Sequence, residues 1–270
     1  KARLSTLVVV TTLFGYLLGS RGGNFNGWLL LHTLIGTTLC AFAAAIYNQI
    51  MEMEADAKMD RTADRPLPSR RMAPEFAFGL GWILAALGIV HLLMRVNLPA
   101  ASIAAATIAV YIFVYTPLKT RSTTNTLVGA VSGALPPLIG WAAAGQALDT
   151  PEAVFLFGLL FFWQLPHFLA INWMYRDQYV KGGFVMWSND DESGAKTGLL
   201  AVGFSIAMFL FMLFPFLTGH ATMVYLIGTI ILTGFLVALS WRFYQSRERA
   251  HARQLFFLPL MLGIVLVAWR

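Results

Sequence analysis

The sequence has 270 residues, of which 58% are hydrophobic and only 12% charged, with a net charge of +6 and a mean hydropathy of +0.67. Soluble domains carry about 25% charged residues, and a soluble fold this apolar would have too little polar surface to face water. The composition therefore excludes a soluble protein, and the lack of alternating polar and apolar residues excludes a transmembrane β-barrel.

Apolar runs separated by polar breaks predict an all-α polytopic membrane protein, because crossing a bilayer takes about 20 apolar residues. The nine predicted helices lie at residues 4–20, 28–50, 74–94, 98–117, 124–145, 152–175, 197–217, 220–241 and 252–269. Two long polar loops, 48–73 and 176–196, follow the second and the sixth helix. This offset suggests two four-helix halves plus a ninth helix.

The basic residues are distributed very unevenly between the two sides that these helices define. If the N-terminus is inside, every Lys and Arg except Arg21, Arg95 and Arg270 lies inside. This positive-inside bias predicts a cytoplasmic N-terminus and cytoplasmic polar loops, so the net charge does not indicate a nucleic-acid partner. The lack of a visible transit peptide favours a bacterial inner membrane over the mitochondrial inner membrane.

The first polar cluster lies at the inner end of the second helix, where Asn48, Glu52 and Asp56 are spaced four residues apart. This spacing puts the three side chains near one helix face. Carboxylates at membrane depth normally mark function, and Mg²⁺ typically binds one or two carboxylates together with substrate phosphates. We therefore expect Asn48, Glu52 and Asp56 to bind Mg²⁺.

Basic residues follow this acidic face directly and predict a diphosphate site. Arg65 precedes Pro66, which disfavours helix there, so a loop should fold back over the carboxylates. Arginine binds phosphate oxygens bidentately. The expected diphosphate ligands are Lys58, Arg61, Arg65, Lys119, Arg121 and Lys181. In the alternative interpretation, these residues form an ordinary basic loop whose arginines pair with the acids.

Small residues and prolines mark the fifth predicted helix. Gly129 and Gly133 are spaced to let helices approach closely. Pro136 and Pro137 should kink or break the helix, because each lacks a backbone donor. Tight packing alone would also explain this pattern.

The third cluster surrounds Pro166, which we expect to interrupt the sixth helix. Gln164 and His167 lie on one face, among aromatic residues that include Trp163 and Phe168. These aromatic side chains would stabilise a carbocation by cation–π attraction. The alternative is that His167 is a hydrogen-bonded structural residue.

These motifs resemble the UbiA-type intramembrane prenyltransferases, and in particular their haem O synthase branch. The matching residues are Asn48, Glu52, Asp56, Arg61, Thr62 and Arg65–Leu67; Tyr115–Lys119 and Arg121; Asn125, Gly129, Gly133, Pro136, Pro137, Gly140 and Trp141; and Trp163, Gln164, Pro166–Phe168 and Asp177–Tyr179. The second aspartate-rich motif of quinone-forming relatives is reduced to Asp177. Phe168 and Tyr175 replace its other acids.

The resemblance implies one domain over residues 1–270, with nine helices around a central cavity that opens to the inner face. It implies farnesyl transfer from farnesyl diphosphate to the vinyl group of haem b, with water addition, giving haem O. Haem b is then a substrate rather than a cofactor. The implied partners are the lipid bilayer, haem A synthase and terminal oxidase assembly proteins.

The resemblance also assigns residues to the metal and to the acceptor. Asp177 is a further metal ligand beside Asn48, Glu52 and Asp56. The implied haem and prenyl pocket comprises Tyr115, Trp163, Gln164, His167, Phe168, Asn172 and Asp177. Two alternatives stay open: a prenyltransferase acting on a quinone precursor, and a secondary transporter.

Overall fold

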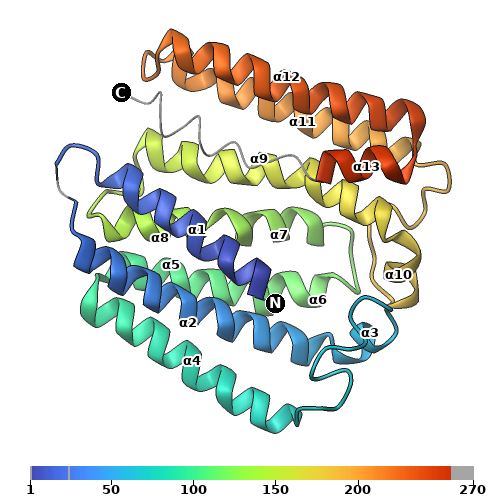
Figure 1. Ribbon diagram of the computed structural model, residues 1–270, viewed down its shortest axis with the longest axis horizontal. Helices are drawn as coiled ribbons and strands as arrows, with labels where there is room; N and C mark the ends of the chain where they lie inside the picture. The colour runs from blue at the N-terminus through green and yellow to red at the C-terminus, as the bar shows by residue number, and fades with distance from the viewer. Residues whose placement is uncertain (1, 24, 257–270) are drawn as a thin grey trace. The chain divides into compact units, whose positions relative to one another are not determined.

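The computed structural model describes residues 2–23 and 25–256, and their regular structure is helical (Figure 1). The chain divides into two compact units. The first comprises Lys1–Phe157 with Val180–Val185, and the second comprises Gly158–Tyr179 with Met186–Arg270. The boundary between the units falls within one long helix, α9.

The first unit contains the helices around Asn48, Glu52 and Asp56 and those next to Lys119 and Arg121. They are α1 (Ala2–Gly19), α2 (Gly27–Met51), α3 (Met53–Ala57), α4 (Pro74–Arg95), α5 (Leu98–Ala109), the π-helix η1 (Val110–Tyr115), α6 (Thr116–Leu118), α7 (Asn125–Ala134) and α8 (Pro136–Ala143). Asparagines cap the N-termini of α2 and α5. Asn26 accepts hydrogen bonds from the N–H groups of Trp28 and Leu29, and Asn97 accepts one from Ala100. These caps satisfy backbone donors that lack helical partners.

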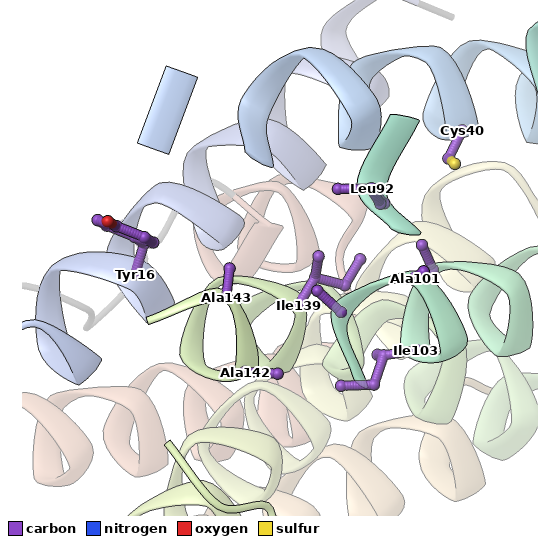
Figure 2. Close-up of a cluster of buried hydrophobic side chains, with 10 residues drawn as sticks. Tyr16, Cys40, Leu92, Ala101, Ile103, Ile139, Ala142 and Ala143 are labelled. Carbon is purple, nitrogen blue, oxygen red and sulfur yellow. The ribbon is translucent and has the colours of Figure 1, made fainter. Parts of the chain in front are cut away.

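The core of this unit is built largely from small residues (Figure 2). Tyr16 and Leu92 are fully buried among the alanines of α5 and α8. A Cβ atom on Gly140 of α8 would lie 1.9 Å from the carbonyl oxygen of Thr12 in α1. Close backbone approach of this kind is how membrane helices gain packing energy without a hydrophobic driving force.

The second unit contains the rest of α9 (Pro151–Met174), α10 (Arg176–Lys181, whose last two residues lie in the first unit), α11 (Ala195–Leu217), α12 (Met223–Ser246) and α13 (Arg249–Phe256). α11 and α12 lie side by side (Figure 1), and Ser205 and Ser240 share a hydrogen bond of 2.7 Å between them. Asp191 accepts hydrogen bonds from both the N–H and the hydroxyl of Thr197 at the start of α11. Burial alone raises the pKa of Asp191, but these hydrogen bonds outweigh it and the pKa is lowered.

Within residues 2–23 and 25–256, seven helical stretches are long and apolar enough to cross a membrane, and Leu4–Gly19 is a shorter apolar helix. The bounds of the nine spans stay predictions. The break at the double proline is confirmed, since α7 ends at Ala134 and α8 begins at Pro136. The ninth span, predicted at 252–269, lies outside the described residues beyond Phe256, where α13 ends.

The prediction that Pro166 interrupts its helix was wrong, because α9 continues through this proline. A proline removes one backbone hydrogen bond, and neighbouring groups can compensate for that loss inside a membrane protein. The fourth predicted span, residues 98–117, also departs from a regular α-helix. It widens into the π-helix η1 just before Pro117.

Candidate active site

Three polar side chains lie buried where α2 meets α3. Asn48, Glu52 and Asp56 are 0%, 6% and 1% exposed. Glu52 separates the two helices, and its carbonyl accepts a hydrogen bond of 2.7 Å from the Asp56 N–H. The chain therefore keeps a helical rise across the junction. Two carboxylates and an amide share one small, largely dry region.

Each carboxylate lies against a basic side chain. Lys119 Nζ is 2.7 Å from Glu52 Oε1, and Arg65 Nη1 is 2.5 Å from Asp56 Oδ2. The structure thus places Arg65 back over the acidic face, and it brings Lys119 there from a distant part of the sequence. Buried charges are tolerated only when paired in this way.

The segment after α3 is folded rather than extended. The Thr62 hydroxyl donates a 2.8 Å hydrogen bond to the Asp56 carbonyl, while Met59 and Leu67 are only 2% and 3% exposed. Arg70 has a φ of 57°, which is uncommon for a residue with a side chain. This compact loop holds Arg65 in position over Asp56.

Lys119 is enclosed by aromatic rings. Its Nζ lies 4.6 Å from the centroid of Tyr115 and 5.6 Å from that of Phe184. The Val185 N–H donates to the Lys119 carbonyl at 2.6 Å, and the Asn125 amide donates to the Val185 carbonyl at 2.7 Å. Sequence reasoning missed Phe184, because no sequence signal shows that its loop returns to Lys119.

Opposing effects act on the pKa of the Lys119 ammonium. Burial alone lowers it, but the Glu52 carboxylate and the tyrosines Tyr115 and Tyr111 outweigh burial and raise the pKa well above its usual value. Lys119 is therefore charged at neutral pH, as the partner of the Glu52 carboxylate.

The other predicted diphosphate ligands are exposed in the first unit. Lys58, Arg61, Arg121 and Lys181 all have exposed side chains on loops or helix ends. Their role in binding diphosphate stays a prediction. Exposed cations of this kind raise the local concentration of a polyanion even without fixed contacts.

The third cluster belongs to the second unit, where His167 is held between two rings. Its ring stacks on Trp163 at 5.1 Å and on Phe256 at 4.8 Å, with interplanar angles of 22° and 18°. His167 Nδ1 lies 3.1 Å from the Phe256 carbonyl oxygen. A carbonyl only accepts hydrogen bonds, so neutral His167 carries its proton on Nδ1 and leaves the Nε2 lone pair available.

The remaining predicted pocket residues differ in their surroundings. Gln164 donates to the Leu160 carbonyl of its own helix at 2.9 Å, and Phe168 packs 6.1 Å from the His167 ring. Asn172 is 5% exposed, and its Nδ2 has no hydrogen-bond partner among the described residues. Asp177 is 63% exposed and pairs with Arg249 at 2.5 Å. Its predicted role as a metal ligand stays untested.

The buried donor set fits a hard divalent cation. Within residues 2–23 and 25–256, no three His, Cys, Asp or Glu side chains gather as a metal site. Two carboxylates and an amide oxygen instead offer the oxygen ligands that Mg²⁺ uses when substrate phosphates complete its coordination. The absence of nearby thiol and imidazole groups from this set disfavours softer metals.

Residues 8–262 match the UbiA prenyltransferase family, so the chain belongs to that family and is an integral membrane prenyltransferase. The chain is 39% identical to a protohaem IX farnesyltransferase of Solibacter usitatus, covering 99% of this chain and 96% of that one. It is 40% identical to the protohaem IX farnesyltransferase of Opitutus terrae, covering 99% and 92%.

The fold is also shared with solved structures. A UbiA homologue from Archaeoglobus fulgidus, bound to GPP and Mg²⁺, superposes with a TM-score of 0.70 at 13% identity, covering 97% of this chain and 95% of that one. This likeness supports the helical architecture.

Proposed function

We propose that this chain transfers a farnesyl group from farnesyl diphosphate to the vinyl group of haem b, giving haem O. The observation that carries the proposal is the pairing of buried Glu52 and Asp56 with Lys119 and Arg65, an arrangement suited to a metal–diphosphate complex. The acceptor is inferred from the protohaem IX farnesyltransferases, which match over 99% of the chain.

In this scheme, Lys119 and Arg65 exchange their carboxylate partners for diphosphate oxygens when diphosphate binds. Glu52, Asp56 and the Asn48 oxygen would hold Mg²⁺, which when bound would supply Lewis-acid stabilisation to the diphosphate. Lys119 and Arg65 then turn from the carboxylates to diphosphate oxygens, and Arg61, Lys58, Arg121 and Lys181 add positive charge around them. These cations neutralise the charge that develops on the leaving oxygen.

The transfer balances with water as the third reactant. The bond between the farnesyl C1 carbon and the diphosphate oxygen breaks, and its electron pair leaves with diphosphate. The haem vinyl group supplies the electrons of the new carbon–carbon bond, which leaves a cation beside the pyrrole ring. Water captures this cation and releases a proton. The apolar surroundings exclude water until the carbon–carbon bond has formed.

His167 and Asn172 are the residues that we expect to contact haem. His167 would contact haem as a ligand of the iron or through a propionate. As an iron ligand it would use Nε2, because Nδ1 donates to the Phe256 carbonyl and the ring stacks between Trp163 and Phe256. The buried Asn172 amide supplies a hydrogen-bond donor to the acceptor. His167→Ala should change the absorption spectrum of added haem b. An unchanged spectrum and rate would assign His167 a structural role.

The decisive experiment supplies purified protein in lipid with farnesyl diphosphate, Mg²⁺ and haem b, and detects farnesylated haem by mass. We expect haem O and released diphosphate. A parallel incubation replaces haem b with an aromatic acid. Farnesylation of the acid but not of haem would favour a quinone-precursor prenyltransferase, and the absence of diphosphate release would favour a transporter.

The cellular setting follows from the same proposal. The active loops face the cytoplasm, and the membrane is the bacterial inner membrane. Haem O passes to haem A synthase and to terminal oxidase assembly. Co-purification from mildly solubilised membranes, with an unrelated multi-pass protein as control, would detect these partners.

A further inference from the structure

Thr116 connects the candidate metal site to the backbone of the neighbouring helix. It is 4% exposed and lies at the start of α6, where η1 ends. Its hydroxyl oxygen is 3.1 Å from Asn48 Nδ2 and 2.8 Å from the Tyr111 carbonyl oxygen. Thr116 belongs to the Tyr115–Lys119 motif of the resemblance, but sequence reasoning assigned this threonine no role of its own.

The direction of these two hydrogen bonds follows from the groups involved. The Tyr111 carbonyl can only accept, so the single hydroxyl proton of Thr116 is donated to it. The hydroxyl therefore presents a lone pair to Asn48, and only the amide nitrogen can face that lone pair. The Asn48 carbonyl oxygen consequently points away from Thr116.

We propose that Thr116 is a positioning residue that turns the Asn48 amide nitrogen toward itself and the amide oxygen away from itself, the orientation that a Mg²⁺ ligand requires. The inference rests on the proposed function, in which Asn48 is a ligand of the metal–diphosphate complex. Without the Thr116 hydroxyl, the buried amide loses an acceptor that favours this orientation, and an amide nitrogen turned toward the metal repels a cation. Partners that orient a ligand in this way typically change metal affinity by about 10–100-fold when removed.

The π-helix makes this arrangement possible. In a regular α-helix, the Thr116 N–H would bond to the Ile112 carbonyl. In η1 it bonds to Tyr111, one residue earlier, so the Tyr111 carbonyl accepts from both the N–H and the hydroxyl of Thr116. Pro117, which lacks an N–H group, follows directly. A π-helical turn inside an α-helix is often found at a functional site.

The test measures Mn²⁺ binding by electron paramagnetic resonance, in the presence of farnesyl thiodiphosphate as an unreactive substrate analogue. Thr116→Val should weaken Mn²⁺ binding by about 10-fold or more, and Thr116→Ser should restore it. Thr107→Val is the matched control, because the Thr107 hydroxyl bonds to the Ile103 carbonyl of its own helix at 2.7 Å. Thr116→Ala removes the same hydroxyl and puts no methyl group in its place. This second variant keeps the test valid if the valine variant is unstable.

A double-mutant cycle shows whether Thr116 acts through Asn48. Thr116→Val should weaken Mn²⁺ binding strongly in the wild-type background and hardly at all in the Asn48→Ala background. Equal effects in both backgrounds, or no effect of Thr116→Val or Thr116→Ala, would overturn the inference. If Asp56→Asn leaves Mn²⁺ affinity unchanged, the proposed metal site itself fails, which is a separate result.

Discussion

Glu52 and Asp56 are alike in type and position, yet each is matched with a different cation. Lys119 comes from beyond α6, and Arg65 comes from the loop after α3. A metal ion arriving alone must displace these cations, whereas a metal–diphosphate complex offers them new anionic partners. We infer that metal and diphosphate bind together. We expect Asp56 to contribute most to this binding, because it is the carboxylate with the least access to water.

Asp56→Asn should reduce turnover by at least about 100-fold, as expected for loss of one strong electrostatic contact to the reacting group. The protein should stay folded, because an amide still accepts a hydrogen bond from Arg65. Haem O formation and the melting temperature in detergent provide the two measurements. Asp60→Asn, an exposed change in the same loop, is the control, and full activity of Asp56→Asn would end the metal assignment.

Lys119→Met should lower stability, because it leaves the Glu52 carboxylate buried without this ammonium group; the loss of such a partner costs up to about 3–5 kcal/mol. The raised pKa of Lys119 sets the pH dependence. Its contribution is fully present below the unfolded pKa of about 10.4 and disappears as pH rises through the folded value.

Melting temperatures measured between pH 7 and pH 11 would therefore show a constant gap between wild type and Lys119→Met at lower pH, narrowing only above about pH 10.4. Glu52→Gln combined with Lys119→Met should recover part of the lost stability, since the uncompensated charge is gone. A gap that closed near neutral pH would contradict the pairing.

At the level of helices, close contact between α1 and α8 depends on the missing side chain of Gly140. The position where its Cβ would lie is occupied by backbone of α1, which cannot move as a flexible side chain can. Close packing of the two helix surfaces therefore holds α1 and α8 together, as expected in a bilayer.

Gly140→Ala should destabilise the protein by about 1–3 kcal/mol or more, because overpacking forces the backbones apart. Gly79→Ala, in α4, is the matched control, since a Cβ there would meet nothing within 4 Å. That control should be neutral or slightly stabilising, because alanine favours helix over glycine. Thermal unfolding in detergent would compare the two, and equal melting temperatures would refute the packing argument.

Sequence patterns predicted most of the helices but not their internal geometry. The apolar run of α2 and the polar loop after it were clear, because hydropathy reports directly on the bilayer. Hydropathy does not distinguish i→i+5 from i→i+4 hydrogen bonding, so η1 was missed. The rule that proline interrupts helices failed at Pro166, since tertiary packing overrides local preference.

Within the candidate site, acid spacing predicted the shared location of Asn48, Glu52 and Asp56. The pairing of Glu52 with Lys119 joins residues 67 positions apart, and no local pattern specifies it. Phe184 and the role of Thr116 were missed for the same reason, because each residue acts on a neighbour that only folding brings near.

At the scale of the whole molecule, the charge pattern predicts which ends of the spans face the cytoplasm. The loops around Glu52 and Lys119 meet at one end of the first unit. The loop between α8 and α9, residues 144–150, follows the C-terminus of α8, at the opposite end of this unit's helices. The topology proposal places the former inside and the latter outside.

Cysteine labelling tests this topology directly, because the single cysteine, Cys40, is 4% exposed and should not react. Asp60→Cys and Asp149→Cys introduce one exposed thiol each, in the two loop regions. In intact cells, a membrane-impermeant maleimide should label the variant at position 149 only. Labelling at position 60 before lysis would reverse the orientation.

The spans of α2 and of α5 through α6 contain no Asp, Glu, Lys or Arg, whereas the four paired charges gather at one end of these helices. Under the proposed function, diphosphate would arrive and leave through the same aqueous face. No ion crosses the hydrocarbon, where each elementary charge would exchange about 2.3 kcal/mol with a potential of about 100 mV. An enzyme built in this way neither drains the membrane potential nor draws on it, so prenyl transfer should proceed equally in energised and in depolarised cells.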